Sequence, residues 1–231
     1  MKRVCIVPVK SLEKAKGRLA AVLNELQRRA LQLAMLKDVL HAVRQSRLFA
    51  ETYLVTANAS ALDSMQKWPG LYLLREPSPE WGLNGAVRWS LSYAQYKGAQ
   101  AALVIHADLP LVTSATLSEF VGEASGEPEV LLAASHDGGT NAMYLCPPDA
   151  VTPQFGVGSL GLHLKEAMLR EVRARVVESP ELAQDIDVWI DVLRVQGLLR
   201  EGHTFQWLQE HLSAEGTTPG ATIGAHTRRQ R

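Results

Sequence analysis

Short apolar runs alternate with longer segments of helical periodicity along most of this 231-residue chain. The runs have the length of strands, and their alternation with helices is typical of βαβ units in a mostly parallel sheet. The run Ala101–Ile105 is apolar throughout, as expected of a central strand that is buried on both faces. The pattern therefore predicts an α/β fold. Neither an internal repeat nor a linker interrupts it, so one domain is expected.

The boundaries of the expected elements follow from the same pattern. Strands are predicted at residues 4–9, 52–56, 71–74, 101–105, 130–134, 142–145 and 174–177, with the strand at 142–145 antiparallel at an edge. Helices are predicted at residues 24–45, 58–67, 85–96, 113–124, 159–170, 188–199 and 204–212. The domain is expected to comprise residues 1–214. Residues 215–231, rich in small, polar and basic side chains, are expected to form a disordered tail.

A concentrated positive segment follows the first expected strand. Lys10 ends that strand, and Lys14, Lys16 and Arg18 follow it with a single acid, Glu13, among them. Ligands of open α/β sheets bind beyond the carboxyl ends of the strands, so this segment is placed to bind a polyphosphate. The glycines of a Walker loop are absent, so side-chain charge would hold the phosphates. On charge alone, a loop that simply faces solvent explains the segment equally well.

The rest of the chain excludes several classes of partner. The 24 lysines and arginines balance 24 aspartates and glutamates, so no overall field favours nucleic acid or an anionic membrane. No apolar stretch approaches the roughly 18 residues of a membrane span, and the run at 4–9 is too short for a secretory signal. Cys5 and Cys146 lie in strand-like segments and are expected to be buried, inert thiols. A cytoplasmic protein is therefore expected.

Three aspartates are candidate metal ligands. Asp108 follows the buried strand directly, and Pro110 prevents sheet pairing from continuing there. Asp185 and Asp187 are two residues apart, so in an extended segment their side chains point to the same side, which is costly unless a cation neutralises them. A turn cap and a solvated loop also explain these residues singly. Together with the cationic segment, they indicate a site for Mg²⁺, which prefers carboxylate and phosphate oxygens.

Three glycine-rich segments, at residues 82–85, 138–141 and 155–159, are candidate substrate contacts. The first and third open expected helices, where backbone amides and a hydroxyl can bind an anion. Asn84 in the first offers a donor and an acceptor to the edge of a base. Plain helix-initiating turns explain these segments as well. His106 lies near Asp108, but no serine or cysteine nucleophile accompanies the pair, so a catalytic dyad is not expected.

Six motifs occur in a fixed order: Val7-Pro8-Val9-Lys10 with Ala15-Lys16-Gly17-Arg18-Leu19, Gly82-Leu83-Asn84-Gly85-Ala86, Ala107-Asp108-Leu109-Pro110, Gly138-Gly139-Thr140-Asn141-Ala142, Phe155-Gly156-Val157-Gly158-Ser159 and Asp185-Ile186-Asp187. No single motif is decisive, but the ordered set resembles the guanylyltransferase family of deazaflavin-coenzyme (factor 420) biosynthesis. Members of that family transfer GMP from GTP to 2-phospholactate, phosphoenolpyruvate or 3-phosphoglycerate.

The resemblance implies a fold and a division of roles. The fold is a three-layer, Rossmann-like α/β sandwich of the nucleotide-diphosphosugar-transferase type. The implied metal ligands are Asp108, Asp185 and Asp187, and the implied triphosphate contacts are Lys10, Lys16 and Arg18. The expected substrate-binding residues are Asn84, Thr140, Asn141, Gly156 and Ser159, of which Thr140, Gly156 and Ser159 would contact the phospho-acid. A homodimer is compatible with the resemblance. After Asp187 the family has Thr-Pro where this chain has Val188-Trp189, so the following helix is expected to begin differently.

The implied reaction needs no protein nucleophile. The acceptor is already a phosphate with a second pKa of about 6, so it needs no general base. Two anions must approach each other, and two unit charges about 4 Å apart repel by roughly 4 kcal/mol at an effective dielectric of 20. Mg²⁺ and the three cationic side chains would offset that repulsion.

Other functions stay open from the sequence. Another nucleotidyltransferase of the same fold, acting on the molybdenum cofactor or a sugar phosphate, would open with L-x-G-G rather than Val-Pro-Val-Lys. A non-catalytic nucleotide-binding module would bind GTP without Mg²⁺. A metal-dependent glycosyltransferase would have Asp-x-Asp where this chain has Asp108-Leu109-Pro110. The motifs do not indicate which phospho-acid is the acceptor.

Overall fold

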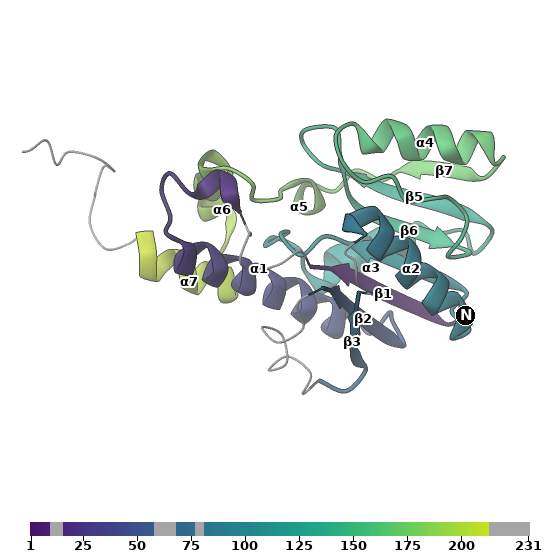
Figure 1. Ribbon diagram of the computed structural model, residues 1–231, viewed down its shortest axis with the longest axis horizontal. Helices are drawn as coiled ribbons and strands as arrows, with labels where there is room; N and C mark the ends of the chain where they lie inside the picture. The colour runs from purple at the N-terminus through teal and green to yellow at the C-terminus, as the bar shows by residue number, and fades with distance from the viewer. Residues whose placement is uncertain (10–15, 58–67, 77–80, 213–231) are drawn as a thin grey trace, which may run out of the picture.

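The computed structural model describes residues 1–9, 16–57, 68–76 and 81–212. Its strands are β1 (Arg3–Pro8), β2 (Glu51–Thr56), β3 (Leu71–Arg75), β4 (Ala101–Ile105), β5 (Glu129–Ala134), β6 (Thr140–Cys146) and β7 (Arg173–Val176). Its helices are the 3₁₀ turn η2 (Gly17–Leu19), α1 (Glu25–Ser46), α2 (Gly82–Tyr96), α3 (Ser114–Gly122), α4 (Ser159–Leu169), α5 (Pro180–Ala183), α6 (Trp189–Leu198) and α7 (His203–Leu212). Figure 1 shows their arrangement.

The seven strands form one sheet in the order β3-β2-β1-β4-β6-β5-β7. Strand β6 pairs antiparallel with both β4 and β5, and the other pairs are parallel. The antiparallel direction of β6 was predicted, but its expected place at an edge is wrong, because β3 and β7 are the edges. A short apolar run indicates burial without specifying its neighbours, and β6 is buried at every position except the last.

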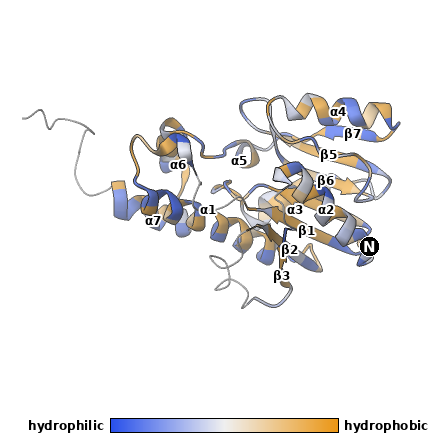
Figure 2. Ribbon diagram, viewed as in Figure 1, coloured by the Kyte–Doolittle hydropathy of each residue, from blue (hydrophilic) through white to orange (hydrophobic). Residues whose placement is uncertain are grey.

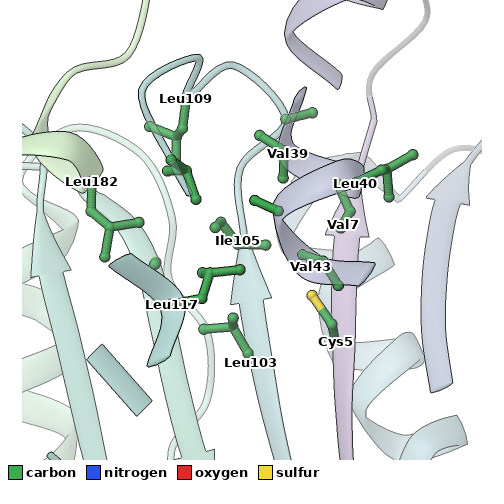
Figure 3. Close-up of a cluster of buried hydrophobic side chains, with 14 of the residues drawn as sticks. Cys5, Val7, Val39, Leu40, Val43, Leu103, Ile105, Leu109, Leu117 and Leu182 are labelled. Carbon is green, nitrogen blue, oxygen red and sulfur yellow. The ribbon is translucent and has the colours of Figure 1, made fainter. Parts of the chain in front are cut away.

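Helices cover both faces of the sheet and complete a three-layer sandwich. On one face, α1 and α3 pack against β1 and β4 through Leu40, Val43 and Leu117 (Figure 3). On the other face, α2 and α4 supply Leu91 and Ala167 to a second core. Figure 2 shows apolar residues along the strands between these layers. Fully burying a leucine or valine side chain contributes about 1.5–3 kcal/mol, so the two cores fix the strand ends that carry polar loops.

Most predicted elements are confirmed within one to three residues, which is the usual spread of helix and strand boundaries. The turns η2 and α5 were not expected, because each is too short to show periodicity. The helix predicted at 58–67 and the tail predicted at 215–231 lie outside the described residues.

Cys5 is buried and Cys146 is half-buried, and both are free thiols. Among the described residues, none of the helices combines the length and the apolar character that crossing a membrane requires.

A third, smaller core lies away from the sheet and joins the segment that follows β1 to the last helices of the described chain. Leu19 of η2 and Leu23 pack there with Ile186, Trp207 and Leu208. Figure 1 shows α6 and α7 beside the first half of α1 in this part of the molecule. The region after Gly202, whose role the sequence left open, therefore supports the segment that contains Lys16 and Arg18.

Helix α7 is attached to α1 by a side chain that caps it. Both carboxylate oxygens of Asp38 accept hydrogen bonds at the start of α7, from the backbone of His203 at 2.7 Å and of Thr204 at 2.8 Å. A carboxylate at this position satisfies amides that no helical carbonyl can reach and interacts favourably with the helix dipole. The third core is thus held by polar contacts as well as apolar ones.

Candidate active site

A cavity of about 340 Å³ opens at the carboxyl ends of β1 and β4. Its charged lining residues are Lys16, Arg18, Asp108 and Asp187, and its other lining residues are Pro8, Val9, Gly17, Gln32, Leu83, His106 and Ala107. This is the end of a parallel sheet at which ligands bind. The cationic segment and the acidic residues that the sequence singled out therefore meet in one place.

The structure brings the three predicted metal ligands together. One carboxylate oxygen from each of Asp108, Asp185 and Asp187 lies within 4.8 Å of the others. The juxtaposition depends on the backbone, since Ile186 N donates to Asp108 O at 3.2 Å, and the fully buried Ile186 anchors the segment in the third core. The carboxylates of Asp185 and Asp187 thus lie together beside Asp108, as their spacing predicted.

Lys16 lies between two of the three carboxylates of this cluster. Its Nζ lies 2.6 Å from Asp108 Oδ2 and 2.9 Å from Asp187 Oδ1, and only 5% of its side chain is exposed. Burial by itself lowers the pKa of Lys16, but attraction to Asp108 and then Asp187 outweighs burial and raises the pKa above its ordinary value. The ammonium is therefore charged and shared between two carboxylates.

Burial and neighbouring charges also shift the pKa values of two of the carboxylates. Burial would raise the pKa of Asp108, but Lys16 holds it below its usual range. Burial, reinforced by the neighbouring charge of Asp108, raises the pKa of Asp185. One buried cation therefore offsets only part of the repulsion in the trio, which leaves it attractive to further positive charge.

The other two predicted cations differ from Lys16. Arg18 lies at the rim, with 72% of its side chain exposed and its Nη1 3.7 Å from Asp187 Oδ2. Lys10 lies outside the described residues. At the rim, a guanidinium is placed to meet an incoming anion but gains little from its own surface ion pair.

The donor set fits a hard divalent cation. Asp108 Oδ1 is buried, and no hydrogen-bond partner for it is found among the residues that the structure describes. Three carboxylates with a free buried oxygen match the oxygen ligands that Mg²⁺ prefers. Neighbouring groups orient them: Asn141 Nδ2 donates to Asp185 Oδ1 at 3.2 Å, and Asp191 Oδ2 accepts from the backbone of Asp187 at 3.0 Å.

The contact with Asp191 also explains how α6 begins without Thr-Pro. Asp191 Oδ2 accepts a second hydrogen bond, from Val188 N at 2.9 Å, and thereby caps the helix from its third position. The predicted difference at Val188-Trp189 is therefore compatible with an ordered helix start next to Asp187.

A bulge in β6 directs two of the predicted substrate residues to opposite faces of the sheet. Ala133 pairs with Ala142 but Ala134 pairs with Thr140, so Asn141 is an extra residue on β6. Asn141 turns to the α5 side, where Nδ2 donates to Leu182 O at 2.9 Å, while Thr140 turns toward α4. Bulges commonly redirect side chains next to active sites in this way.

Asn84 bridges α2 and the third glycine-rich segment. Its Nδ2 donates to Phe155 O at 2.9 Å, and its Oδ1 accepts from Phe155 N at 2.7 Å. Both halves of the amide that sequence reasoning assigned to a base edge are thus used within the protein. Beyond Phe155, Gly156 is exposed with a φ of 135°, and Ser159 begins α4 with 1% exposure. Their contact with a substrate stays a prediction.

Sequence reasoning missed three residues of the site. Gln32 of α1 lines the cavity, His136 Nδ1 lies 3.5 Å from Asp185 Oδ1, and His163 is fully buried beside Thr140. The first two come from segments with no distinguishing motif. His163 had a usable signal, because it lies one helical turn after Ser159 and therefore on the same face of α4.

The Asn84 bridge yields a testable prediction. Replacing Asn84 with alanine removes two hydrogen bonds, each worth about 0.5–1.5 kcal/mol, from the backbone of Phe155. We expect the amide of Phe155 to exchange with solvent about tenfold faster or more, as measured by hydrogen–deuterium exchange. Ser92→Ala, an exposed change on the same helix, is the matched control. Unchanged exchange at Phe155 in the Asn84 variant would contradict the prediction.

Comparison with solved structures supports the fold. A structure from Desulfovibrio desulfuricans G20, assigned to the nucleotide-diphospho-sugar transferases, matches with a TM-score of 0.77. The two chains are 15% identical, and the match covers 92% of this chain and 96% of the other. At that identity the likeness shows the fold alone, and it confirms the predicted three-layer sandwich.

Sequence similarity identifies the family as well as the fold. The family model described as "Guanylyl transferase CofC like" matches residues 3–210. A phosphoenolpyruvate guanylyltransferase from Rubrobacter xylanophilus is 38% identical over 193 residues, which cover 83% of this chain and 92% of that protein. A 3-phospho-D-glycerate guanylyltransferase from Phenylobacterium zucineum is 34% identical over 184 residues, 78% of this chain and 84% of that protein. The resemblance drawn from the six motifs is confirmed, and the chain belongs to the CofC-like guanylyl transferase family.

Proposed function

We propose that this enzyme transfers GMP from GTP to a small phosphorylated acid and releases pyrophosphate. The observation that carries the proposal is the cavity at the ends of β1 and β4, where Lys16 lies between Asp108 and Asp187. The cluster offers positive charge to a triphosphate and oxygen ligands to a cation. The reaction is inferred from family membership, and the side chains of this cavity have the charges that such a reaction requires.

The proposed reaction needs neither a protein nucleophile nor a general base. An oxygen of the acceptor phosphate forms a bond to the α-phosphorus of GTP, and the bond from that phosphorus to the bridging oxygen of the β-phosphate breaks. The electron pair leaves with pyrophosphate. The acceptor is largely a dianion at neutral pH, because its second pKa is about 6, so no proton has to be removed first.

The side chains of the site act by positioning and by charge. Lys16 and Arg18 stabilise negative charge that develops on the departing pyrophosphate. Asp108, Asp185 and Asp187 would hold Mg²⁺, which when bound neutralises part of the triphosphate charge. Thr140, Gly156 and Ser159 are proposed to bind the acceptor, beside the acidic cluster that Asn141 joins to β6.

A pyrophosphate-release assay tests the function. The protein is incubated with GTP, MgCl₂ and, in turn, phosphoenolpyruvate, 2-phospho-L-lactate and 3-phospho-D-glycerate. We expect turnover with at least one acid, none without an acid, and loss of turnover when EDTA removes the divalent cation. ATP and CTP are the nucleotide controls. Inactivity with all three acids, together with GTP binding that is independent of Mg²⁺, would instead indicate a non-catalytic nucleotide-binding module.

The acceptor and the assembly are further proposals. We propose phosphoenolpyruvate as the first acceptor to test, because the relative with 38% identity is named for it. We also propose a cytoplasmic location, where GTP is available. The homodimer stays a prediction that analytical ultracentrifugation tests.

A further inference from the structure

His163 of α4 is a fully buried histidine that connects two parts of the proposed acceptor site. Its Nδ1 lies 3.0 Å from Thr140 Oγ1, on β6, and its Nε2 lies 2.9 Å from the backbone nitrogen of Gln154. Its ring packs edge-on against Phe155 at a centroid distance of 5.1 Å. Both ring nitrogens and one ring edge are therefore committed to named neighbours.

These contacts determine which ring nitrogen carries the proton. The backbone N–H of Gln154 can only donate, so Nε2 of His163 must accept and bears no proton. A neutral imidazole then carries its proton on Nδ1 and donates it to Thr140 Oγ1. Burial first, and then the neighbouring His106, lower the pKa of His163 to about 4, so the ring is neutral at neutral pH.

The tautomer in turn determines the role of the Thr140 hydroxyl. Because Oγ1 accepts from His163, its own hydrogen remains available to be donated. Among the residues that the structure describes, the hydroxyl of Thr140 has no partner other than His163. Thr140 is only 2% exposed, so this hydrogen is poorly solvated, and a hydrogen bond from it to an anionic oxygen would be strong.

Thr140 also directly precedes a residue that contacts the acidic cluster. Its neighbour Asn141 accepts a hydrogen bond from His106 N through its backbone oxygen at 3.0 Å and contacts Asp185 through its side chain. His106 and Asp108 both line the cavity. Thr140 is therefore joined, through the backbone of Asn141, to the strand end at which the cavity opens.

We propose that His163 is a positioning residue for the acceptor acid. Its Nδ1–H orients Thr140 so that the threonine hydroxyl donates to an anionic oxygen of the acceptor. The proposal rests on the proposed function, in which Thr140 binds the phospho-acid. It adds a residue that never touches substrate and acts through the hydrogen bond to Thr140.

Two conservative variants separate this role from a merely structural one. The amide of His163→Asn reaches the position of Nδ1 and can still donate to Thr140. The amide of His163→Gln reaches the position of Nε2 and keeps only the contact with Gln154. Thr140→Val, which removes the hydroxyl at nearly constant volume, and the double variant with His163→Gln complete a cycle.

The readout is the KM for the acceptor set against the KM for GTP, with phosphoenolpyruvate as the probe. We expect His163→Gln and Thr140→Val to lower kcat/KM for the acid by about 10- to 100-fold, the effect of losing a hydrogen bond to a charged group, with the KM for GTP unchanged. His163→Asn should retain most activity, and the double variant should be no worse than Thr140→Val. Equal losses in the asparagine and glutamine variants, or additive losses in the cycle, would overturn the proposal.

A spectroscopic measurement tests the geometry independently of activity and of variants that fold poorly. Long-range ¹H–¹⁵N correlation of the histidine rings in the wild-type protein distinguishes the Nδ1–H tautomer from the other neutral form and from imidazolium. We expect the Nδ1–H tautomer for His163 at neutral pH. The other tautomer would refute the proposal even if the enzyme is active. If the wild-type protein shows this tautomer but turns over none of the three acids, the proposed function fails while the His163 geometry stands.

Discussion

Asp108→Asn is expected to lower the rate of pyrophosphate release by about 1,000-fold or more while the protein remains folded. The substitution keeps the shape of the side chain but removes the charge that pairs with Lys16 at 2.6 Å, and it replaces one of the two carboxylate oxygens with an NH₂ group that cannot bind a cation. Removing one of three crowded carboxylates also relieves the repulsion that raises the pKa of Asp185. Lys16 also keeps its ion pair with Asp187 at 2.9 Å, so the loss should appear in catalysis rather than in folding.

The experiment compares three measurements on the same variant. Turnover is followed by pyrophosphate release, Mg²⁺ binding by isothermal titration calorimetry, and folding by thermal denaturation. Asp149→Asn, an exposed position that does not line the cavity, is the matched control. Turnover close to that of the wild type would remove Asp108 from the metal site. A loss of turnover that merely follows unfolding would show a structural role instead.

Lys16→Met is expected to change activity and metal affinity in opposite directions. The ammonium lies where it contacts both Asp108 and Asp187, so Lys16 and a divalent cation compete for the negative charge of the same two carboxylates. Removing the lysine should tighten Mg²⁺ binding by about tenfold, since one competing positive charge is gone. Turnover should nevertheless fall by about 100- to 1,000-fold, because the triphosphate loses a buried cation.

The stability of the same variant provides a further check. Taking away one partner of a buried ion pair leaves the remaining charges uncompensated, at a cost of about 3–5 kcal/mol. We therefore expect Lys16→Met to melt at a lower temperature than the wild type without Mg²⁺ and to recover more on its addition. Arg18→Met, which alters an exposed cation beside the same carboxylate, should show little of this recovery. Equal responses to Mg²⁺ in both variants would argue against shared ligands.

The sheet and its helices were largely predictable because burial and periodicity are local signals. The composition of the run Ala101–Ile105 indicates a central strand, since a strand covered on both faces is apolar throughout. The position of β6 was not predictable in this way. Its pairing between β4 and β5 depends on contacts with residues far along the chain, and any apolar strand fits an edge or an interior position by its own pattern.

The clustering of the three candidate metal ligands could be predicted, because their spacing and charge indicated that they share one site. Asp185 and Asp187 are two residues apart, and in the structure their carboxylates lie close to each other and to Asp108. The partners of Asn84 and Thr140 could not be predicted. The bulge at Asn141 exchanges the faces of two adjacent residues, and a shift of one residue in a strand reverses every side chain beyond it. Nothing in the local sequence marks where such a shift occurs.

The packing of Leu19 against Trp207 and Leu208 has a consequence for synthesis of the protein. Lys16 and Asp187 are 171 positions apart, so a ribosome makes the lysine segment long before the helices that support it. The sheet strands β1 to β4 emerge early and can pair among themselves, whereas the charged pocket must wait for residue 208. A nascent chain that is released after Asp187 but before Trp207 carries every cation and aspartate of the site but lacks the packing that brings them together.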